Sequence, residues 1–289
     1  MRPLGECTIG IAGLGLMGGA IALALRNNCG VEQQRLLACD REGDTLASAR
    51  KSGLVAQGYK AERAGEMLKV CDLVFMCLNP SSVIRFLEQW ENAFKQGCVI
   101  TDIAGTKGSI AQAAQALRQD VDFIPGHPMA GAEKGGYANA SLCNFRGKNY
   151  ILTPLARNRR ENLAFLEDVI RKMGFGRITK VTPDEHDRKI AFTSQLCHVI
   201  ASALIDCEAD TRITCFGGGS FEDLTRIAML NAPMWTEIFI ENRQALLERI
   251  EQFEKSLDAI KELITCAKAA ELEKMLAQVR DRRTAMNNP

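Results

Sequence analysis

The sequence predicts a two-domain protein with an α/β domain, built on a doubly wound parallel sheet, followed by an all-α domain. The length of 289 residues is nearly twice that of a typical single domain. The first half alternates short apolar runs with segments of helical length, whereas the second half has mainly helical patterns. These observations favour two domains of different kinds.

Five apolar runs predict the strands of the first domain. Each run is apolar on both faces and is followed by a helical segment, which is typical of a parallel sheet covered on both sides. The runs are residues 8–12, 36–39, 73–78, 99–101 and 123–124. We therefore expect residues 1–155 to form the α/β domain.

The rest of the chain, residues 156–289, is expected to form the helical domain. Only residues 176–178 resemble a further strand. Thr182, Pro183 and Glu185 combine a capping side chain, a proline in the first turn and a capping-box glutamate. They predict a helix from Pro183 to about residue 209. Helical patterns resume from residue 235 to 283, with charges interleaved among leucine and isoleucine, which indicates amphipathic helices.

Composition excludes several classes of protein. The 36 basic and 35 acidic residues leave a net charge of +1, so we expect no nucleic-acid partner. No segment approaches the roughly 18 uncharged apolar residues of a membrane span. The N-terminal residues do not resemble a signal peptide, and we expect a cytoplasmic protein. Three histidines and scattered cysteines lack the spacing of a metal site.

A glycine motif follows the first predicted strand. Its residues are Gly13, Leu14, Gly15, Leu16, Met17 and Gly18. This G-x-G-x-x-G pattern between a strand and a helix is typical of a Rossmann-like dinucleotide-binding domain, where the helix N-terminus receives a pyrophosphate. Asp40 closes the second strand, where its carboxylate can bind the ribose hydroxyls. Asp40 favours NAD, and the adjacent Arg41 keeps NADP as the alternative.

The three histidines have different contexts. His127 follows the run 123–124 through Pro125 and Gly126, so we expect it in a loop at the ligand crevice of the sheet. His198 shares a small polar patch with Ser194 and can be either functional or a satisfied core histidine. His186 lies in a charged first helical turn, and we expect a solvated or capping role there. Of the three, we expect His127 to be the functional histidine.

Two charged residues allow either a structural or a functional interpretation. Glu133 can be an ordinary loop charge in water. Arg226 is a cation among apolar neighbours, which indicates either a partnered side chain or a site for a substrate carboxylate.

Together these residues resemble the prephenate dehydrogenase family. The likeness rests on the glycine motif, the run from Gly126 to Glu133, the Ser194-x-x-x-His198 pair and the run from Arg226 to Ala228. It covers almost the whole chain, from about residue 8 to about residue 254.

The resemblance implies NAD-dependent oxidative decarboxylation of prephenate to 4-hydroxyphenylpyruvate, a step of tyrosine biosynthesis. His127 would take the proton of the ring hydroxyl. Arg226 would bind a substrate carboxylate, Glu133 would guard the pocket entrance, and Ser194 and His198 would contact the substrate. The resemblance also implies a homodimer formed through the helical domain. Arogenate is the alternative substrate.

Two positions depart from the family pattern. Glycine stands at position 105, where the family often has serine, so we place the hydroxyl of Thr106 with the cofactor-binding residues. Gln195 stands where many members carry a further histidine. Both changes bear on the choice of substrate.

Other functions remain open from sequence alone. One is a 3-hydroxyacid dehydrogenase of the same two-domain architecture, although its lysine motif is not found. Another is a protein that binds NAD without turnover, which the glycine at position 105 favours. The short flanks leave no room for a chorismate mutase or a regulatory domain, so we expect any tyrosine inhibition to act at the active site.

Overall fold

The computed structural model describes residues 3–132 and 134–286. The chain divides into two compact units, residues 1–242 and 243–289, each of which is described by itself.

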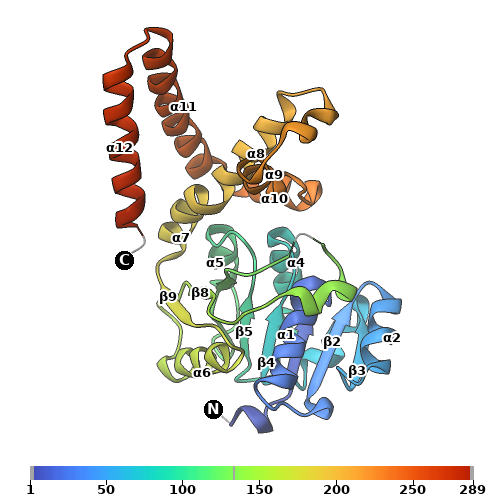
Figure 1. The fold of residues 1–289 in the computed structure, drawn as a ribbon. Helices are drawn as coiled ribbons and strands as arrows, with labels where there is room; N and C mark the ends of the chain where they lie inside the picture. Colours follow the sequence, from blue (N-terminus) through green and yellow to red (C-terminus); the bar gives the residue numbers. More distant parts are fainter. Residues whose placement is uncertain (1–2, 133, 287–289) are drawn as a thin grey trace. The chain divides into compact units, whose positions relative to one another are not determined.

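A six-stranded parallel sheet forms the centre of the first unit (Figure 1). Its strands run in the order β3-β2-β1-β4-β5-β6, as in a doubly wound fold. They are β1 (Ile9–Ala12), β2 (Leu36–Asp40), β3 (Gln57–Lys60), β4 (Leu73–Met76), β5 (Val99–Asp102) and β6 (Asp122–Phe123). The predicted fold class is confirmed, although β3 was not anticipated because its pattern is polar and only partly buried.

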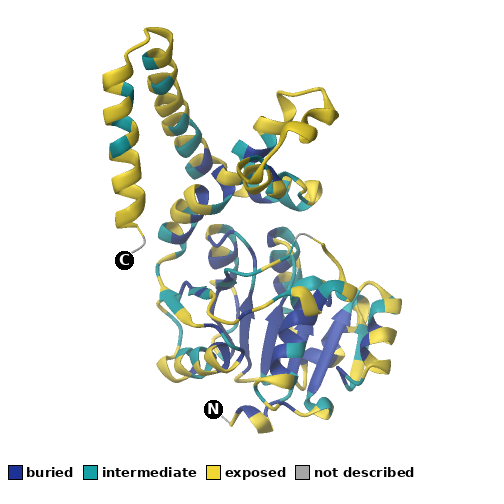
Figure 2. Ribbon diagram, in the orientation of Figure 1, coloured by how far each residue is buried: buried dark blue, intermediate teal, exposed yellow. Residues whose placement is uncertain are grey.

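Both faces of the central strands β1, β4 and β5 are buried (Figure 2). In β4, Leu73 and Phe75 belong to one hydrophobic cluster, whereas Val74 and Met76 belong to another. Side chains alternate between the faces of a strand, so each cluster is the core on one side of the sheet. The covering helices are α1 (Leu16–Asn27), α2 (Gly43–Lys51), α3 (Ala64–Leu68), α4 (Pro80–Trp90), α5 (Gly108–Ala114) and α6 (Arg160–Lys172).

A second, three-stranded sheet continues the first unit. It contains β7 (Gly126–Pro128), β8 (Asn149–Leu152) and β9 (Arg177–Lys180), with β7 antiparallel and β9 parallel to β8. The short strand anticipated near residue 178 is confirmed as β9. The prediction of a loop around His127 is wrong in part, because His127 is the central residue of β7 and pairs with Ile151. The strand was not predicted because two of its three residues, Gly126 and Pro128, are uncommon in strands.

Helix α6 shares the core of the large sheet. Its residues Leu166, Val169 and Ile170 belong to the same buried cluster as Ile9 of β1. The proposed division near residue 155 stays a prediction.

Helices dominate the chain after β9. They are α7 (Pro183–Ile190), a π-helical turn (Ala191–Gln195), α8 (Leu196–Asp206), α9 (Gly219–Thr225) and α10 (Ala232–Glu241). The Thr182 hydroxyl accepts a hydrogen bond of 3.1 Å from the backbone N–H of Glu185, as the capping motif predicts. The predicted helix from Pro183 is therefore confirmed, but a π-helical turn divides it.

The second unit is a pair of helices, α11 (Arg243–Thr265) and α12 (Ala269–Ala285). Ala267 in the connection has a φ of 52°, which allows the chain to reverse. Several apolar side chains of this pair are exposed, among them Leu257, Ile264 and Leu276. Within the described residues, no helix has the length and apolarity needed to cross a membrane.

Candidate active site

A cavity of about 720 Å³ lies at the carboxyl ends of β1, β4 and β5. The glycine loop, the segments after β4 and β5, strand β7 and the helices α8 and α10 all contribute to its wall. Lining residues include Gly15, Gly18, Leu78, Gly105, His127, Ser194, Gln195, His198 and Trp235. This edge is where parallel sheets of this topology bind their ligands.

The glycine loop has the shape of a phosphate-binding turn. Gly13 has a φ of 88°, and a Cβ atom there would lie 2.5 Å from the carbonyl oxygen of Cys77. A Cβ atom on Gly18 would overlap the carbonyl oxygen of Gly13, so the start of α1 can pack closely on the loop. A Cβ atom on Gly15 would meet nothing within 4 Å. The loop therefore leaves open space at the N-terminus of α1, which fits the pyrophosphate of a dinucleotide.

Asp40 lies at the end of β2 beside this loop. One of its carboxylate oxygens accepts a hydrogen bond of 2.5 Å from the backbone N–H of Leu14, and the other accepts one of 2.8 Å from that of Glu42. Arg41 is exposed, and its carbonyl oxygen accepts a hydrogen bond of 2.9 Å from Lys60 Nζ. Lys60 is a cation near Asp40 that sequence analysis missed, because only the pairing of β2 with β3 brings it there.

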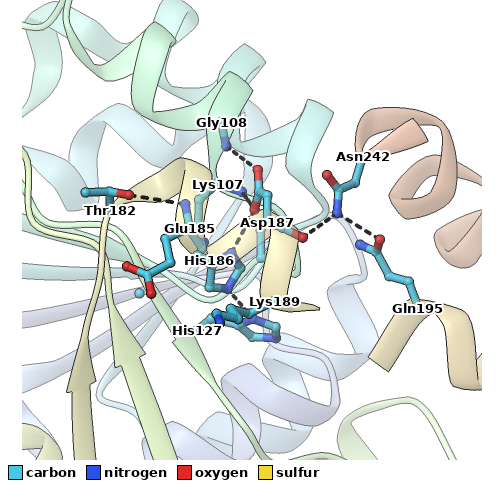
Figure 3. A network of polar contacts seen from close by, with 12 residues as sticks. Lys107, Gly108, His127, Thr182, Glu185, His186, Asp187, Lys189, Gln195 and Asn242 are labelled. Carbon is cyan, nitrogen blue, oxygen red and sulfur yellow. Dashed lines mark hydrogen bonds and ion pairs between the residues drawn. The ribbon is translucent and has the colours of Figure 1, made fainter. Parts of the chain in front are cut away.

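His127 projects from β7 into the wall of the cavity. Its Nδ1 atom lies 2.9 Å from Nε2 of His186, and the two ring centroids are 5.1 Å apart (Figure 3). Burial, aided by the neighbouring His186 and Lys107, holds the pKa of His127 well below its usual value. His127 is thus a neutral imidazole at neutral pH, which is the form that a base requires.

His186 has a different position from the one expected. The prediction of a solvated or capping role is wrong, because only 1% of its surface is exposed. Burial is also the main reason why the pKa of His186 lies below its usual value. The sequence signal that could have predicted this burial is the spacing of His186 from Ile190, which is buried one helical turn later.

Asp187 connects this histidine pair to α5. Its Oδ1 atom lies 2.7 Å from His186 Nδ1 and accepts a hydrogen bond of 2.8 Å from the backbone N–H of Lys107. Its Oδ2 atom accepts another, also of 2.8 Å, from Gly108 (Figure 3). The carboxylate therefore holds α7 against the start of α5.

A buried ion pair supports the strand that carries His127. Lys107 Nζ contacts a carboxylate oxygen of Asp102, and both side chains are fully buried. Asp102 also accepts hydrogen bonds from the backbone N–H groups of Ala104, at 2.9 Å, and Gly126, at 3.2 Å. Gly126 directly precedes His127, so this pair helps to set the position of that histidine.

The π-helical turn supplies Ser194 and Gln195 to the cavity. The Gln195 Oε1 atom accepts a hydrogen bond of 2.8 Å from Asn242 Nδ2, whereas its Nε2 atom has no hydrogen-bond partner within the described structure. His198 Nδ1 lies 2.9 Å from the Ser194 carbonyl oxygen, and its ring stacks on Trp235 with centroids 3.6 Å apart. Trp235 was missed as a site residue, since a helical tryptophan resembles an ordinary core residue.

The remaining predicted residues are not all in the cavity wall. Arg226 is exposed, and the lining residues that the structure describes include its neighbour Ile227 instead. Thr106 is buried beside Gly105, and its hydroxyl has no protein partner among the described residues. Glu133 lies outside the described residues. The roles of these three residues stay predictions.

The strand order, the glycine loop and the histidine at the crevice define a dinucleotide-binding oxidoreductase. Comparison with known families gives the finer assignment. Residues 21–179 match the model "Prephenate dehydrogenase, nucleotide-binding domain", and residues 182–278 match "Prephenate dehydrogenase, dimerization domain". The chain belongs to the prephenate dehydrogenase family.

Individual relatives agree with this assignment. A prephenate dehydrogenase of Lactococcus lactis is 31% identical over 96% of this chain and 76% of the relative. A cyclohexadienyl dehydrogenase of Zymomonas mobilis is 28% identical over 89% of this chain and 88% of the relative.

Solved structures show the same similarity. One is the prephenate dehydrogenase of Aquifex aeolicus in complex with hydroxyphenyl propionate and NAD+, with a TM-score of 0.85 and 28% identity over 96% of this chain and 97% of the other. Another is the arogenate dehydrogenase of Synechocystis, with a TM-score of 0.79 and 28% identity over 96% and 99%. The relatives thus differ in the substrate that their names state, and the family match favours this class over a 3-hydroxyacid dehydrogenase.

Proposed function

We propose that this protein catalyses the NAD-dependent oxidative decarboxylation of prephenate to 4-hydroxyphenylpyruvate, as a step of tyrosine biosynthesis. One observation carries the proposal: His127 lines the same cavity as the glycine loop. A base and a dinucleotide site in one cavity are what the removal of a proton and a hydride from one alcohol requires.

Different residues would bind the cofactor and accept the proton. Gly13, Gly15 and Gly18 leave room for the pyrophosphate of NAD, and Asp40 would bind the ribose. When bound, NAD supplies the hydride acceptor. His127 accepts the proton of the substrate ring hydroxyl through Nε2, because its Nδ1 atom is occupied by His186. Loss of carbon dioxide makes the substrate ring aromatic, which drives the reaction forward.

The opposite wall of the cavity would hold the substrate. Ser194 and His198 offer polar groups there, and the stacked ring of Trp235 gives the wall a flat apolar part. We keep Arg226 as the proposed partner of a substrate carboxylate and Glu133 as the residue at the entrance.

Prephenate is favoured over arogenate by the charges around the cavity. Arogenate carries an ammonium group where prephenate has a side-chain keto group, so its binding calls for an additional acceptor such as a carboxylate. None of the described residues that line the cavity is acidic, so the proposed entrance residue Glu133 is left as the carboxylate that could serve an ammonium group. The donor Gln195 Nε2, which has no partner within the described structure, suits a keto or carboxylate oxygen better than an ammonium group.

We also propose NAD as the preferred cofactor and a homodimer as the working form. Asp40 would repel the 2′-phosphate of NADP, while Arg41 and Lys60 support NADP as the alternative. The match of residues 182–278 to a dimerization domain supports assembly through the helices.

The test is the absorbance of reduced nicotinamide when the purified protein and NAD receive prephenate, with arogenate and NADP in parallel reactions. We expect the fastest rise with prephenate and NAD. A faster rise with arogenate would make arogenate the preferred substrate. No rise with either substrate, despite measurable NAD binding, would refute the proposed reaction.

A further inference from the structure

His127, His186 and Asp187 form a continuous chain of hydrogen bonds that leads away from the cavity (Figure 3). The first contact, His127 Nδ1 to His186 Nε2, measures 2.9 Å, and the second, His186 Nδ1 to Asp187 Oδ1, measures 2.7 Å. His186 is buried and does not line the cavity among the residues described there. Any effect of His186 and Asp187 on the substrate must therefore pass through His127.

The donor and acceptor of each hydrogen bond in this chain follow from Asp187, at the end far from the cavity. Both oxygens of Asp187 already accept backbone N–H groups, from Lys107 and Gly108. A carboxylate in this setting is an acceptor only, so the hydrogen of the second contact must belong to His186 Nδ1. In a neutral ring the other nitrogen, His186 Nε2, then has a lone pair.

The same reasoning fixes the ring of His127. Because His186 Nε2 has a lone pair, the hydrogen of the first contact must lie on His127 Nδ1. His127 Nε2 then carries the lone pair, and it is the nitrogen that remains for the cavity. The opposite arrangement would place a hydrogen on His127 Nε2, where the ring could not accept a proton.

We infer that His186 and Asp187 are positioning residues that hold His127 in the tautomer with hydrogen on Nδ1 and a free lone pair on Nε2. Asp187 sets the direction because α5 begins at its carboxylate, and His186 transmits it to the base. This inference rests on the proposed role of His127.

The rest of the surroundings is consistent with a fixed arrangement. Asn242 Nδ2 donates a hydrogen bond of 2.9 Å to the carbonyl oxygen of Asp187, which ties this residue to the end of α10. Lys107, a cation that lowers the pKa of both histidines, is engaged with Asp102. Charge and geometry therefore both favour two neutral rings in one relative orientation.

The decisive variant is Asp187→Ala, which removes the acceptor that fixes hydrogen on His186 Nδ1. Both tautomers of the histidine pair should then become populated, because no hydrogen bond selects one of them. We expect kcat to fall by about 3- to 10-fold, with little change in the affinity for NAD. Asp184→Ala is the matched control, since it removes a carboxylate from an exposed ion pair on the same helix.

The tautomer itself can be measured without substrate. The chain has only three histidines, so ¹⁵N-labelled histidine gives a simple NMR spectrum in which each ring is assigned by its loss in a single variant. At pH 7.5 we expect His127 to carry hydrogen on Nδ1 in the native protein and in Asp184→Ala, but to divide between Nδ1 and Nε2 in Asp187→Ala.

A second variant distinguishes a change of tautomer from a loss of folding. In His186→Gln, Asp187 would attract the amide nitrogen and leave the amide oxygen to accept from His127 Nδ1, so we expect the native tautomer of His127 and a higher kcat than in Asp187→Ala. Hydrogen on His127 Nε2 in the native protein, or an unchanged tautomer in Asp187→Ala, would overturn the inference. The expected tautomers without turnover of prephenate or arogenate would instead refute the proposed function and leave the inference standing.

Discussion

The Nδ1 atom of His127 and the Nε2 atom of His186 lie 2.9 Å apart, although the residues are 59 positions apart in the chain. Only one of the two nitrogens can carry hydrogen in such a contact. Protonating His186 would place hydrogen on both nitrogens of this contact, and protonating either ring would place a charge in a buried site. This relationship has consequences for both stability and catalysis.

Stability should depend on pH through this pair. The pKa values of His127 and His186 lie below the unfolded value of 6.5, so the unfolded chain binds more protons in acid. We expect the free energy of unfolding to decrease as the pH falls below about 6.5, by up to about 1.4 kcal/mol per pH unit for each histidine. Urea unfolding between pH 5 and 8 measures this slope, which should be smaller in His186→Gln. Equal slopes in the two proteins would contradict the prediction.

Replacing the base should affect turnover rather than cofactor binding. His127→Asn removes the proton acceptor but leaves the glycine loop intact. We expect kcat to fall by about 10²- to 10⁴-fold while the Kd for NAD, measured by fluorescence or calorimetry, stays within about twofold. Undiminished turnover in this variant would exclude His127 from the mechanism.

The glycine loop offers a pair of variants with different expected outcomes. Gly15→Ala meets no protein atom within 4 Å, so we expect a native melting temperature but at least about tenfold weaker NAD binding, since the methyl group occupies the space of the pyrophosphate. Gly18→Ala meets the backbone of Gly13 and should lower the melting temperature as well. Gly5→Ala, which also meets nothing within 4 Å, is the control. Native NAD affinity in Gly15→Ala would place the pyrophosphate elsewhere.

Asp40 should control the choice between the two nicotinamide cofactors. Asp40→Asn removes the charge that repels a 2′-phosphate, while Lys60 remains nearby. We expect the ratio of kcat/KM for NAD to that for NADP to fall by about tenfold or more, which corresponds to about 1.4 kcal/mol. Lys60→Gln should shift the ratio in the opposite direction. A ratio that does not change in Asp40→Asn would mean that another group recognises the ribose.

The proposed carboxylate contact of Arg226 can be tested directly. A hydrogen bond to a charged group contributes about 1.5–3 kcal/mol, so Arg226→Ala should raise the KM for prephenate roughly 10- to 100-fold and leave the Kd for NAD unchanged. Arg212→Ala, at another exposed arginine of the helical segment, serves as the control. A native KM in Arg226→Ala would remove this residue from the substrate site.

Most of the large sheet was predictable because its signals are local. Strands buried on both faces are continuous apolar runs, and the turn after β1 needs glycines at a set spacing, whatever surrounds it. Strands β3 and β7 lack such runs, and in β8 only Tyr150 and Leu152 are buried. β7 was mistaken for a loop, since its three residues include a glycine and a proline and only the pairing with β8 makes it a strand.

The sequence by itself therefore determined the fold class and the dinucleotide loop, and it predicted a functional role for His127, because each depends on neighbouring residues. Only the tertiary structure decided what surrounds His127. A helical turn that looked charged and solvated brings His186 and Asp187 into the interior, where α5 and β7 meet them. Hydrogen bonds between distant segments depend on packing, and the burial that makes them strong leaves no periodic pattern in the chain.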